Sequence, residues 1–517
     1  MRLPVSGRAR RAIVIGSGPN GLAAAITLAE RGWDTTVYEA GDRLGGSVAS
    51  AELTEPGVIH DVFSAVYPAA VASPVFARWP LARHGLAWVH PPIALAHPLP
   101  DGSAPALHRS PARTAATLEG DRPGDGAAWQ RFAAGYLAHF GALRSVMLAG
   151  FPPVAGGARL LAALKLEGTL EFARLLLAPA SGLADDLFTG PHARAWLYGS
   201  ALHADVGPTG GGSAIAAAYL ALLGHAVGWP SPRGGAGRLT DALVSLLHSL
   251  GGQTHTATPV ARIHGQDGRV TGVGLADGTM LPAEVVVANT SAAGLTRLAA
   301  QILPSSELGK LRRFRRGPGT VKVDWSLDGP IPWTAPAARQ AGTLHVGGWA
   351  EELARAVSEV DLGVWPERPF CLVGQQSVAD RTRAPAGIHT AWGYTRVPVA
   401  AGQDPQTLGA AVATHVARIE AQVERFAPGF TRQIRARHVQ GPAELEAANP
   451  NLTAGDVGGG SFSIDQVVFR PTPRLSPYRT GVAGLTLGSA AAFPGGAVHG
   501  VPGHAAALAA HHDRLLR

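Results

Sequence analysis

The first part of the chain alternates between apolar runs and a helical stretch in a way that is typical of a β-α-β unit. Residues 12–15 form a short continuous apolar run, residues 21–31 are rich in alanine, and residues 34–39 are rich in β-branched side chains. A short apolar run bounded by turn residues predicts a buried parallel strand, and the alanine-rich stretch predicts a helix. The pattern therefore predicts a strand, a helix and a second strand in succession.

The hydrophobic period changes further along the chain. From about residue 100 to residue 229 it is helical, with its longest segments at 128–147 and 160–177. The pattern then returns to α/β, with a predicted helix at 239–250 and short predicted strands at 258–263, 270–275 and 285–288.

The last third of the chain mixes short strands with helices. Residues 319–394 contain strand patterns separated by proline and glycine turns, and residues 406–426 are predicted to form one helix. A strand at 485–487, a glycine-rich turn and a helix at 502–514 are predicted to end the chain.

These elements predict an α/β fold in which a Rossmann-like dinucleotide-binding domain is interleaved with a mixed-sheet and helical substrate domain. The 517 residues exceed a single core, because cores stop growing near ~250–300 residues. We expect the dinucleotide-binding domain to be discontinuous and to take residues 1–100, 230–300 and 478–517. The substrate domain, with its helical cap, is expected to take residues 101–229 and 301–477.

A glycine-rich turn connects the first predicted strand to the first predicted helix. Its residues are Gly16, Gly18, Pro19, Asn20 and Gly21. Glycines are needed where the chain turns tightly and where its main chain meets a pyrophosphate, and the helix N-terminus then faces the phosphate charge. Glu39 ends the second strand 18 residues after Gly21, near the ~20-residue offset of an acid that binds ribose hydroxyls.

A second polar and glycine-rich block follows the second strand. It contains Glu39, Ala40, Arg43, Gly45, Gly46 and Ser47. The Arg43 side chain is suited to contact pyrophosphate charge, and the glycine doublet lets the main chain approach a cofactor. A polar loop without a ligand is the alternative explanation.

Two later segments complete the set of motifs. Residues 234–242 and the strand that starts at Val260 form one of them. The other lies at 484–503 and contains Gly488, Ser489, Gly496 and Val498. A glycine turn that leads into a helix directs free N–H groups and the positive end of the helix dipole at one point, which would stabilise the anion formed when a flavin is reduced.

Together these blocks resemble the phytoene desaturase-like (phytoene dehydrogenase-related) family of FAD-dependent oxidoreductases, within the FAD amine oxidase superfamily. The resemblance covers most of the chain and is weakest from residue 100 to residue 200. It implies FAD as the cofactor, so that the Rossmann-like domain is an FAD-binding domain, and main-chain contact between Val260 and the adenine. It also implies that a hydrophobic, isoprenoid or polyene-like molecule loses hydride to the flavin. Ser489 departs from the pattern, because many flavoproteins have an acid there.

Three residues are candidates for catalysis. His499 lies inside the C-terminal glycine turn and is placed to face the flavin, although a histidine that caps the loop is the more common explanation. His60, with Asp61, lies near the isoalloxazine by resemblance, either as an acid/base group or as a partner in loop hydrogen bonds. Lys322 lies between Val321 and Val323, either facing the flavin or on an edge strand.

Composition narrows the classes of partner. Hydrophobic residues make up 46% of the chain and charged residues 16%, which predicts an ordered globular protein. The net charge of +7 comes from scattered residues rather than a basic block, so nucleic acid is not an expected partner, while peripheral contact with an anionic membrane stays open. The single cysteine excludes an intramolecular disulfide and fits a cytoplasmic protein.

The competing functions differ in what the flavin does. The sequence has no second strand-glycine-helix unit for a nicotinamide, so dioxygen or a quinone is the expected electron acceptor. An amine oxidase-like flavoprotein is one alternative, and a non-catalytic lipid or isoprenoid escort protein is another. No metal-ligand motif is found, and the substrate and the oligomeric state stay open.

Overall fold

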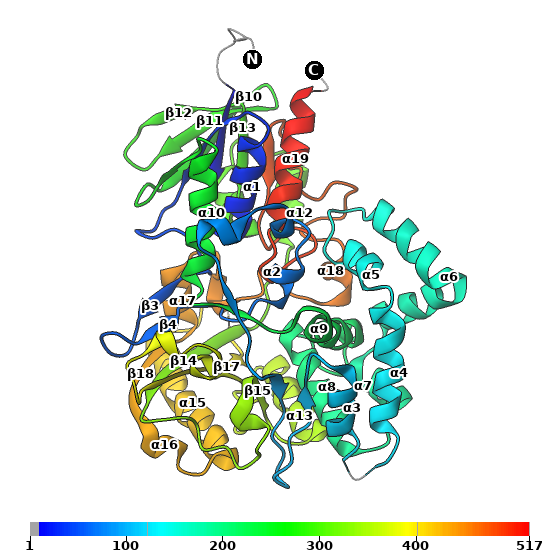
Figure 1. Cartoon of the computed structure of the whole chain (residues 1–517). Helices are drawn as coiled ribbons and strands as arrows, with labels where there is room; N and C mark the ends of the chain where they lie inside the picture. The colour runs from blue at the N-terminus through cyan, green and yellow to red at the C-terminus, as the bar shows by residue number, and fades with distance from the viewer. Residues whose placement is uncertain (1–9, 121, 401, 516–517) are drawn as a thin grey trace.

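The computed structural model describes residues 10–120, 122–400 and 402–515. The basic start of the chain, up to residue 9, lies outside the described residues. Figure 1 shows an upper part built around a parallel sheet, a lower part built around a second sheet, and a group of helices at one side. Helices α1 (Pro19–Ala29) and α19 (Val501–Leu515), from the two ends of the sequence, lie next to each other in the upper part.

The parallel sheet confirms the predicted Rossmann-like unit. Its five strands follow the order β19-β13-β1-β2-β9, and every neighbouring pair is parallel. The strands are β1 (Arg11–Ile15), β2 (Asp34–Tyr38), β9 (Gln253–His255), β13 (Val285–Ala288) and β19 (Leu485–Leu487). The predicted strand at 485–487 is thus confirmed with its bounds.

Three helices cover this sheet. Helix α1 (Pro19–Ala29) packs against both α10 (Gly237–Ser249) and α19 (Val501–Leu515). Small side chains allow this close packing, because the buried positions of α1 include four alanine or glycine residues in the run 21–25. An antiparallel sheet of β10 (Val260–Gln266), β11 (Arg269–Leu275) and β12 (Met280–Pro282) is attached at the same end, as Figure 1 shows.

The second sheet has seven strands in the order β18-β14-β17-β16-β15-β6-β7. Helix α15 (Pro405–Phe426) covers one of its faces, where Val321, Val323 and Val397 belong to the same buried cluster as Val416 and Ile419. The strands are β6 (Ile93–Ala96), β7 (Ala106–Leu107), β14 (Gly319–Leu327), β15 (Ala341–Val346), β16 (Cys371–Gly374), β17 (His389–Val397) and β18 (Ile434–Gln440).

Strand β6 moves the expected domain boundary. Residues 93–96 lie inside the segment 1–100 that we assigned to the FAD-binding domain, yet β6 pairs with β15 in the second sheet. On the other side, Leu303 and Leu311 pack in a cluster with Ile13 and Ile15 of the first sheet, beyond the expected boundary at residue 300. The chain therefore enters the second sheet before residue 100, and it still packs against the first sheet after residue 300.

The region from residue 100 to 229 is helical, as predicted. The expected helical segment at 128–147 is two helices, α4 (Asp125–Leu137) and α5 (Phe140–Met147), and α6 (Val154–Leu177) is interrupted at Lys165, where φ is 58°. In Figure 1, α5 and α6 project from one side of the molecule. The other helices of this region are α3 (Pro111–Leu118), α7 (Ala180–Leu187), α8 (Pro191–Ala201) and α9 (Ser213–Val227).

Short elements connect these parts. Two of them are two-stranded ladders, one of β3 (Ser50–Glu52) with β4 (Ile59–Asp61) and one of β5 (Trp88–Val89) with β8 (Ser231–Pro232). The remaining α-helices are α2 (Pro68–Ala72), α11 (Ala292–Leu298), α12 (Ser305–Arg312), α13 (Ala350–Asp361), α14 (Gln376–Ala379), α16 (Phe430–Gln433), α17 (Pro442–Ala448) and α18 (Ile464–Val467).

Candidate functional site

The first glycine turn has the geometry that a pyrophosphate cradle requires. A Cβ atom on Gly21 would lie 2.1 Å from the main-chain oxygen of Gly16, so only glycine fits there. Gly18 is the N-cap of α1 and provides no capping side chain, and the first turn of the helix carries no acid. The positive end of α1 therefore faces this turn, which fits a dinucleotide phosphate. The Asn289 side chain lies beside the turn, and its Nδ2 is 3.3 Å from Gly16 O.

Glu39 is fixed beside that turn. One of its carboxylate oxygens accepts hydrogen bonds from the Ser17 main-chain nitrogen at 2.8 Å and from Ser17 Oγ at 2.6 Å, and the other accepts from Gly41 N at 3.0 Å. The acid thus stands at the end of β2 where a ribose-binding acid is expected. Ala40 and Arg43 lie on the exposed loop that follows, and Arg43 pairs with Asp42 at 3.6 Å. The contact of Arg43 with pyrophosphate stays a prediction.

The second glycine block packs directly onto the first. A Cβ atom on Gly46 would lie 3.0 Å from Gly18 Cα, and Gly45 N donates to Ser17 Oγ at 3.0 Å. Ser47 Oγ accepts a hydrogen bond from Asn449 Nδ2 at 3.1 Å. No role was predicted for Asn449 from the sequence. The only indication there was that it lies in a part of the chain covered by the family resemblance.

Val260 is brought to the same edge of the sheet as Glu39. The residues before it make this connection, because Ala257 N donates to Gly41 O at 2.7 Å and Thr258 N donates to Glu39 O at 2.8 Å. Val260 then starts β10. Its main chain therefore lies next to the ribose-binding position, where an adenine would follow the ribose.

The C-terminal block joins the cradle through α19. Gly488 N donates to Ala288 O at 2.9 Å, and Ser489 Oγ accepts from Ala491 N at 3.2 Å, so the Ser489 hydroxyl is used within its own turn. A Cβ atom on Gly503 would lie only 1.7 Å from Asn20 O of α1. Gly496 and Val498 are half-buried in the loop between β19 and α19.

His499 is buried in that loop and bonded within it. Its Nδ1 accepts from Val501 N at 3.2 Å, so Nε2 carries the proton and donates to Gly496 O at 3.3 Å. Burial lowers the pKa of His499 to about 4, so the ring is neutral at pH 7. These contacts agree with the alternative in which His499 caps the loop. A catalytic role of His499 stays a prediction.

His60 and Asp61 lie on β4 and make hydrogen bonds to several segments. His60 Nε2 bonds Thr54 Oγ1 at 2.8 Å, and burial together with the Lys322 charge lowers the pKa of His60 to about 3. The Asp61 carboxylate accepts from Ala236 N at 2.7 Å and from Arg383 Nη1 at 2.6 Å. Asp61 thereby connects the β3–β4 hairpin to the glycine-rich residues before α10. This agrees with the alternative in which His60 and Asp61 make loop hydrogen bonds.

Lys322 lies on an interior strand, because β14 is flanked by β18 and β17. The edge-strand alternative for Lys322 is therefore wrong. Its Nζ donates to the main-chain oxygen of Asp61 at 3.0 Å and pairs with Asp324, and both side chains are buried. Burial raises the pKa of Asp324 to about 6, against the opposing effect of the Lys322 charge.

One face of the second sheet is lined by polar and aromatic side chains, which we call the polar face. In the antiparallel register Lys322 lies opposite Tyr394 and Asp324 lies opposite Trp392, so these four side chains share a face. The register of the next strands adds Thr343 and His345. The polar face consists of Lys322, Asp324, Thr343, His345, Trp392, Tyr394 and Arg396. In the sequence, the alternation of large polar or aromatic residues with smaller ones along 389–397 indicated this face.

Arg396 and His345 connect the polar face to the helical region. Tyr394 keeps accessible surface, yet burial raises the pKa of its phenol to about 12. The Arg396 guanidinium lies 5.1 Å from the centroid of the Tyr394 ring and pairs with Asp205. His345 Nε2 lies 2.7 Å from Nε2 of His203, whose pKa burial lowers to about 3. No role was predicted for these residues from the sequence.

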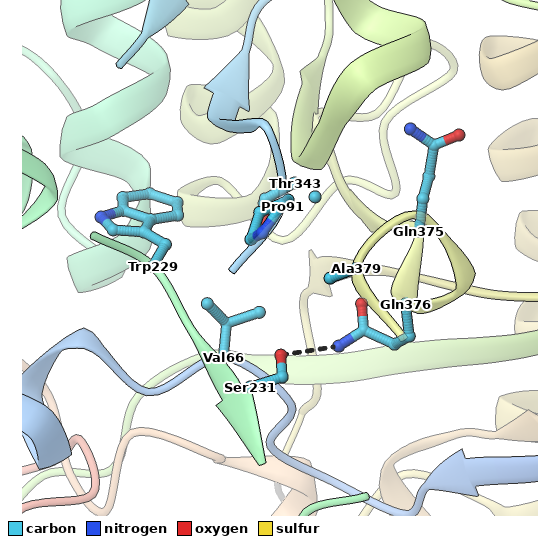
Figure 2. Close-up of a pocket in the computed structure, with 9 residues that line it drawn as sticks. Val66, Pro91, Trp229, Ser231, Thr343, Gln375, Gln376 and Ala379 are labelled. Atoms are coloured by element: carbon cyan, nitrogen blue, oxygen red, sulfur yellow. Dashed lines mark hydrogen bonds between the residues drawn. The ribbon is translucent and has the colours of Figure 1, made fainter. Parts of the chain in front are cut away.

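A small pocket lies between the polar face and the segment that follows β4; we call it the neutral pocket. Figure 2 shows Gln376 and Ser231 joined by a hydrogen bond of 3.3 Å, with Val66, Trp229 and Thr343 around them. Ser231 Oγ also donates to Ala65 O at 2.8 Å. None of the nine residues that line the pocket has an ionisable side chain: Val66, Pro91, Trp229, Ser231, Gly342, Thr343, Gln375, Gln376 and Ala379.

Two further features bear on the class of protein. Within residues 10–120, 122–400 and 402–515, no helix combines the length and the apolar character needed to span a bilayer. In the same described ranges, no three or more His, Cys, Asp or Glu side chains are grouped so that they could bind a metal ion.

Comparisons with known families agree with this geometry. A model described as NAD(P)-binding Rossmann-like domain matches residues 14–79, and a model described as flavin containing amine oxidoreductase matches residues 103–509. The pyridine nucleotide-disulfide oxidoreductase domain-containing protein 2 of Rattus norvegicus is 27% identical over 97% of this chain and 93% of its own length. A phytoene desaturase (neurosporene-forming) of Rhodobacter capsulatus is 26% identical over 95% of this chain and 92% of its own length.

Solved structures share the fold at low sequence identity. An oxidoreductase from Methanosarcina mazei superimposes with a TM-score of 0.65 at 14% identity, covering 96% of this chain and 99% of that one. A putrescine oxidase bound to putrescine superimposes with a TM-score of 0.61 at 13% identity, covering 98% and 99%. At such identities the structures support the common fold alone.

Proposed function

Because the chain belongs to the family of flavin-containing amine oxidoreductases, we propose that it is an FAD-dependent dehydrogenase that removes hydride from a hydrophobic small molecule. The substrate class is isoprenoid or polyene-like, and dioxygen or a quinone is the final electron acceptor. Bound FAD supplies the site that accepts the hydride.

The glycine cradle supports the choice of cofactor. Gly16, Gly18 and Gly21 with the start of α1 would hold the pyrophosphate, and Glu39 would hold the ribose. Val260 would contact the adenine through its main chain. The flavin end would lie along the C-terminal block, at Gly488, Ser489, Gly496 and Val498.

The lining of the neutral pocket, whose volume is about 10 Å3, is the observation that supports an uncharged substrate. Its lining offers amide and hydroxyl groups and apolar surface, but no carboxylate to pair with an ammonium. Arg396 lies over the Tyr394 ring, so the aromatic face that would attract a cation is already occupied by one. Both features favour an uncharged reacting part of the substrate.

Helix α6 supports a route for lipophilic molecules. Five large apolar side chains are exposed on it, of which Val154 at 72%, Leu166 at 66% and Leu177 at 66% are the most accessible. Contiguous exposed apolar surface marks interaction sites for apolar ligands or membranes. We therefore include peripheral contact of α6 with a lipid surface in the proposal.

The proposed reaction does not require a strong acid or base among the side chains. Loss of hydride from an allylic carbon leaves a delocalised cation, and a proton then leaves the adjacent carbon. The chain must exclude water, orient the carbon and accept that proton. His60, Lys322 and His499 are the candidates for proton transfer, and each is buried.

Amine oxidation is a second candidate with its own supporting observation. Trp392 and Tyr394 are stacked on the polar face with ring centroids 5.8 Å apart, and aromatic faces attract an ammonium group. The Arg396 charge opposes that binding, which is why we rank the dehydrogenase first.

Anaerobic flavin reduction tests the proposal directly. Purified protein loaded with FAD is mixed with neutral polyenes and, in parallel, with primary and secondary amines of similar length. We expect the flavin absorption band to bleach with the polyenes and not with the amines. Bleaching by amines alone would establish the second candidate instead, and protein that binds no FAD would support the escort alternative and overturn both flavin activities.

A further inference from the structure

A second pocket opens on the surface beside the neutral pocket; we call it the basic pocket. It has a volume of about 320 Å3 and is lined by His90, His108, Arg109 and Arg113, among others. Arg109 and Arg113 are exposed at the rim, whereas His108 is buried at 6% exposure. No part of the proposed flavin chemistry uses these residues.

The residues that line the basic pocket include two arginines and no Asp or Glu. Arg109 and Arg113 each contribute a guanidinium group. Burial lowers the pKa of His90 and the charge of Arg109 lowers it further, and burial and Arg113 act in the same way on His108. The two arginine charges thus act on both histidine rings.

His108 has a buried ring nitrogen that lacks a protein partner. Its main chain is fixed, because His108 N and O bond Thr114 Oγ1 and His225 Nδ1 at 2.9 and 2.8 Å. Its Nδ1 is nevertheless inaccessible and makes no hydrogen bond among the described residues. Leaving such an atom unpaired costs about 1–3 kcal/mol, so an unpaired atom in a pocket wall indicates a ligand.

Local geometry keeps the basic pocket open. Ser110 lines it and caps α3, so the positive end of that helix adds to the two arginines. Gly228 has φ of 78°, and a Cβ atom there would lie 2.8 Å from His90 Nδ1 and 3.4 Å from Arg109 Cδ. Glycine at this position thus preserves space between the two basic side chains.

The basic pocket and the neutral pocket share Pro91 and Trp229 in their walls. Figure 2 shows these two residues on the side of the neutral pocket away from Gln375. We infer that the basic pocket binds an oxyanion, a phosphate or a carboxylate, at one end of an amphipathic substrate whose apolar part packs against Pro91, Pro92 and Trp229 in the wall of the same pocket. This inference rests on the proposed function, because it adds a charged head group to the hydrophobic substrate.

Binding of simple amphiphiles to the FAD-loaded protein tests the inference. The probes are dodecyl phosphate, dodecanoate, dodecanol and inorganic phosphate, with affinity measured by calorimetry. Because charge-assisted hydrogen bonds to the arginines exist only for the anions, we expect both alkyl anions to bind roughly 10- to 100-fold tighter than dodecanol. We expect inorganic phosphate to bind more weakly than dodecyl phosphate, because it lacks the apolar part.

A paired variant identifies the residues. In Arg109→Met/Arg113→Met the preference for the alkyl anions should disappear while the affinity for dodecanol is kept. The control is Arg312→Met/Arg313→Met, which removes the same charge from two exposed residues, the last residue of α12 and the one after it. This control should keep the preference for the alkyl anions. If the first variant melts lower than the control, Arg113→Lys serves in its place and should retain the anion preference only in part.

The outcomes separate this inference from the proposed function. Equal affinity for dodecyl phosphate and dodecanol, or an anion preference that survives Arg109→Met/Arg113→Met, overturns the basic pocket while polyene-dependent flavin bleaching stands. Equal affinity for inorganic phosphate and dodecyl phosphate overturns the assignment to a substrate head group. An arginine-dependent anion preference in a protein whose flavin no polyene reduces supports the basic pocket and overturns the proposed function.

Discussion

The ammonium group of Lys322 donates a hydrogen bond of 3.0 Å to the main-chain oxygen of Asp61, and so joins the second sheet to the hairpin that follows the cofactor cradle. The same ammonium neutralises Asp324, whose side chain is fully buried. Lys322 thus has a structural task that any catalytic task must accommodate.

Replacing Lys322 should separate these two tasks. In Lys322→Met the buried Asp324 carboxylate loses its cation, and the free energy of unfolding should fall by about 3–5 kcal/mol in urea denaturation. The double variant Lys322→Met/Asp324→Asn removes both charges and should recover part of that loss. The control Lys165→Met, at an exposed position of α6, should change stability by less than about 0.5 kcal/mol.

The double variant also tests catalysis. If Lys322 takes part in proton transfer, Lys322→Met/Asp324→Asn should fold and bind FAD but reduce it far more slowly with substrate. Flavin reduction at the rate of the unaltered protein would limit Lys322 to its structural task.

The contact between α1 and α19 should not tolerate a methyl group. In Gly503→Ala the new Cβ would meet Asn20 O at 1.7 Å, so the two helices must separate. We expect a loss of about 1–3 kcal/mol or more and weaker FAD retention, because Asn20 belongs to the cradle. The matched control Gly409→Ala, where nothing lies within 4 Å, should be neutral or slightly stabilising.

Glu39 should govern affinity for the cofactor. Glu39→Ala removes the carboxylate that accepts from Ser17 and Gly41 and that would bind the ribose hydroxyls. We expect the affinity of the apoprotein for FAD to fall roughly 10- to 100-fold in a fluorescence titration, since hydrogen bonds to a charged group contribute about 1.5–3 kcal/mol. Glu52→Ala, on the exposed side of β3, is the control, and an equal effect of both variants would contradict the ribose contact.

Acid should unfold the protein because of its buried histidines. Burial lowers the pKa of His60 to about 3 and those of His97, His415 and His499 to about 4, from 6.5 in the unfolded chain. Between pH 6.5 and 4 the unfolded state binds more protons, so stability present above pH 6.5 is lost as pH falls, by about 1.4 kcal/mol per pH unit for each histidine.

Two buried carboxyls oppose that trend. The pKa values of Asp324 and Asp205 are raised to about 6, so each favours the folded state at low pH, and this contribution disappears as pH rises through 6. The histidines are more numerous, and the net slope should follow them. Urea midpoints at pH 7.5, 6 and 5 measure it, and a midpoint that stays constant or rises toward pH 5 would contradict the assignment of neutral buried rings.

Local patterns predicted the first sheet because its strands carry their own signals. The apolar run at β1, the glycines before α1 and the strand Leu485–Leu487 are each visible within a few residues. The glycine blocks likewise predicted which distant segments meet, since Gly46 does lie against Gly18 and the C-terminal block against α1.

Other features depend on distant partners that no local pattern reveals. Strand β6 has four residues, and its partner β15 follows about 250 residues later, so its membership of the second sheet could not be predicted from residues 93–96. Strand β18 is an edge strand that contains Arg435, Arg437 and His438, so its sequence resembles that of a polar loop. The pairing of Arg396 with Asp205 and of His203 with His345 likewise joins the polar face to the helical region.

The order of strands in the first sheet sets a constraint on synthesis. Strand β1 leaves the ribosome first, but its sheet is completed only when β13 and β19 arrive, and α1 gains its partner α19 last of all. A nascent chain must therefore keep the part of α1 that packs against α19 uncovered until residues 501–515 are made, which exposes it to aggregation. The protein should accordingly depend on chaperones during translation more than a domain whose strands pair in the order in which they are made.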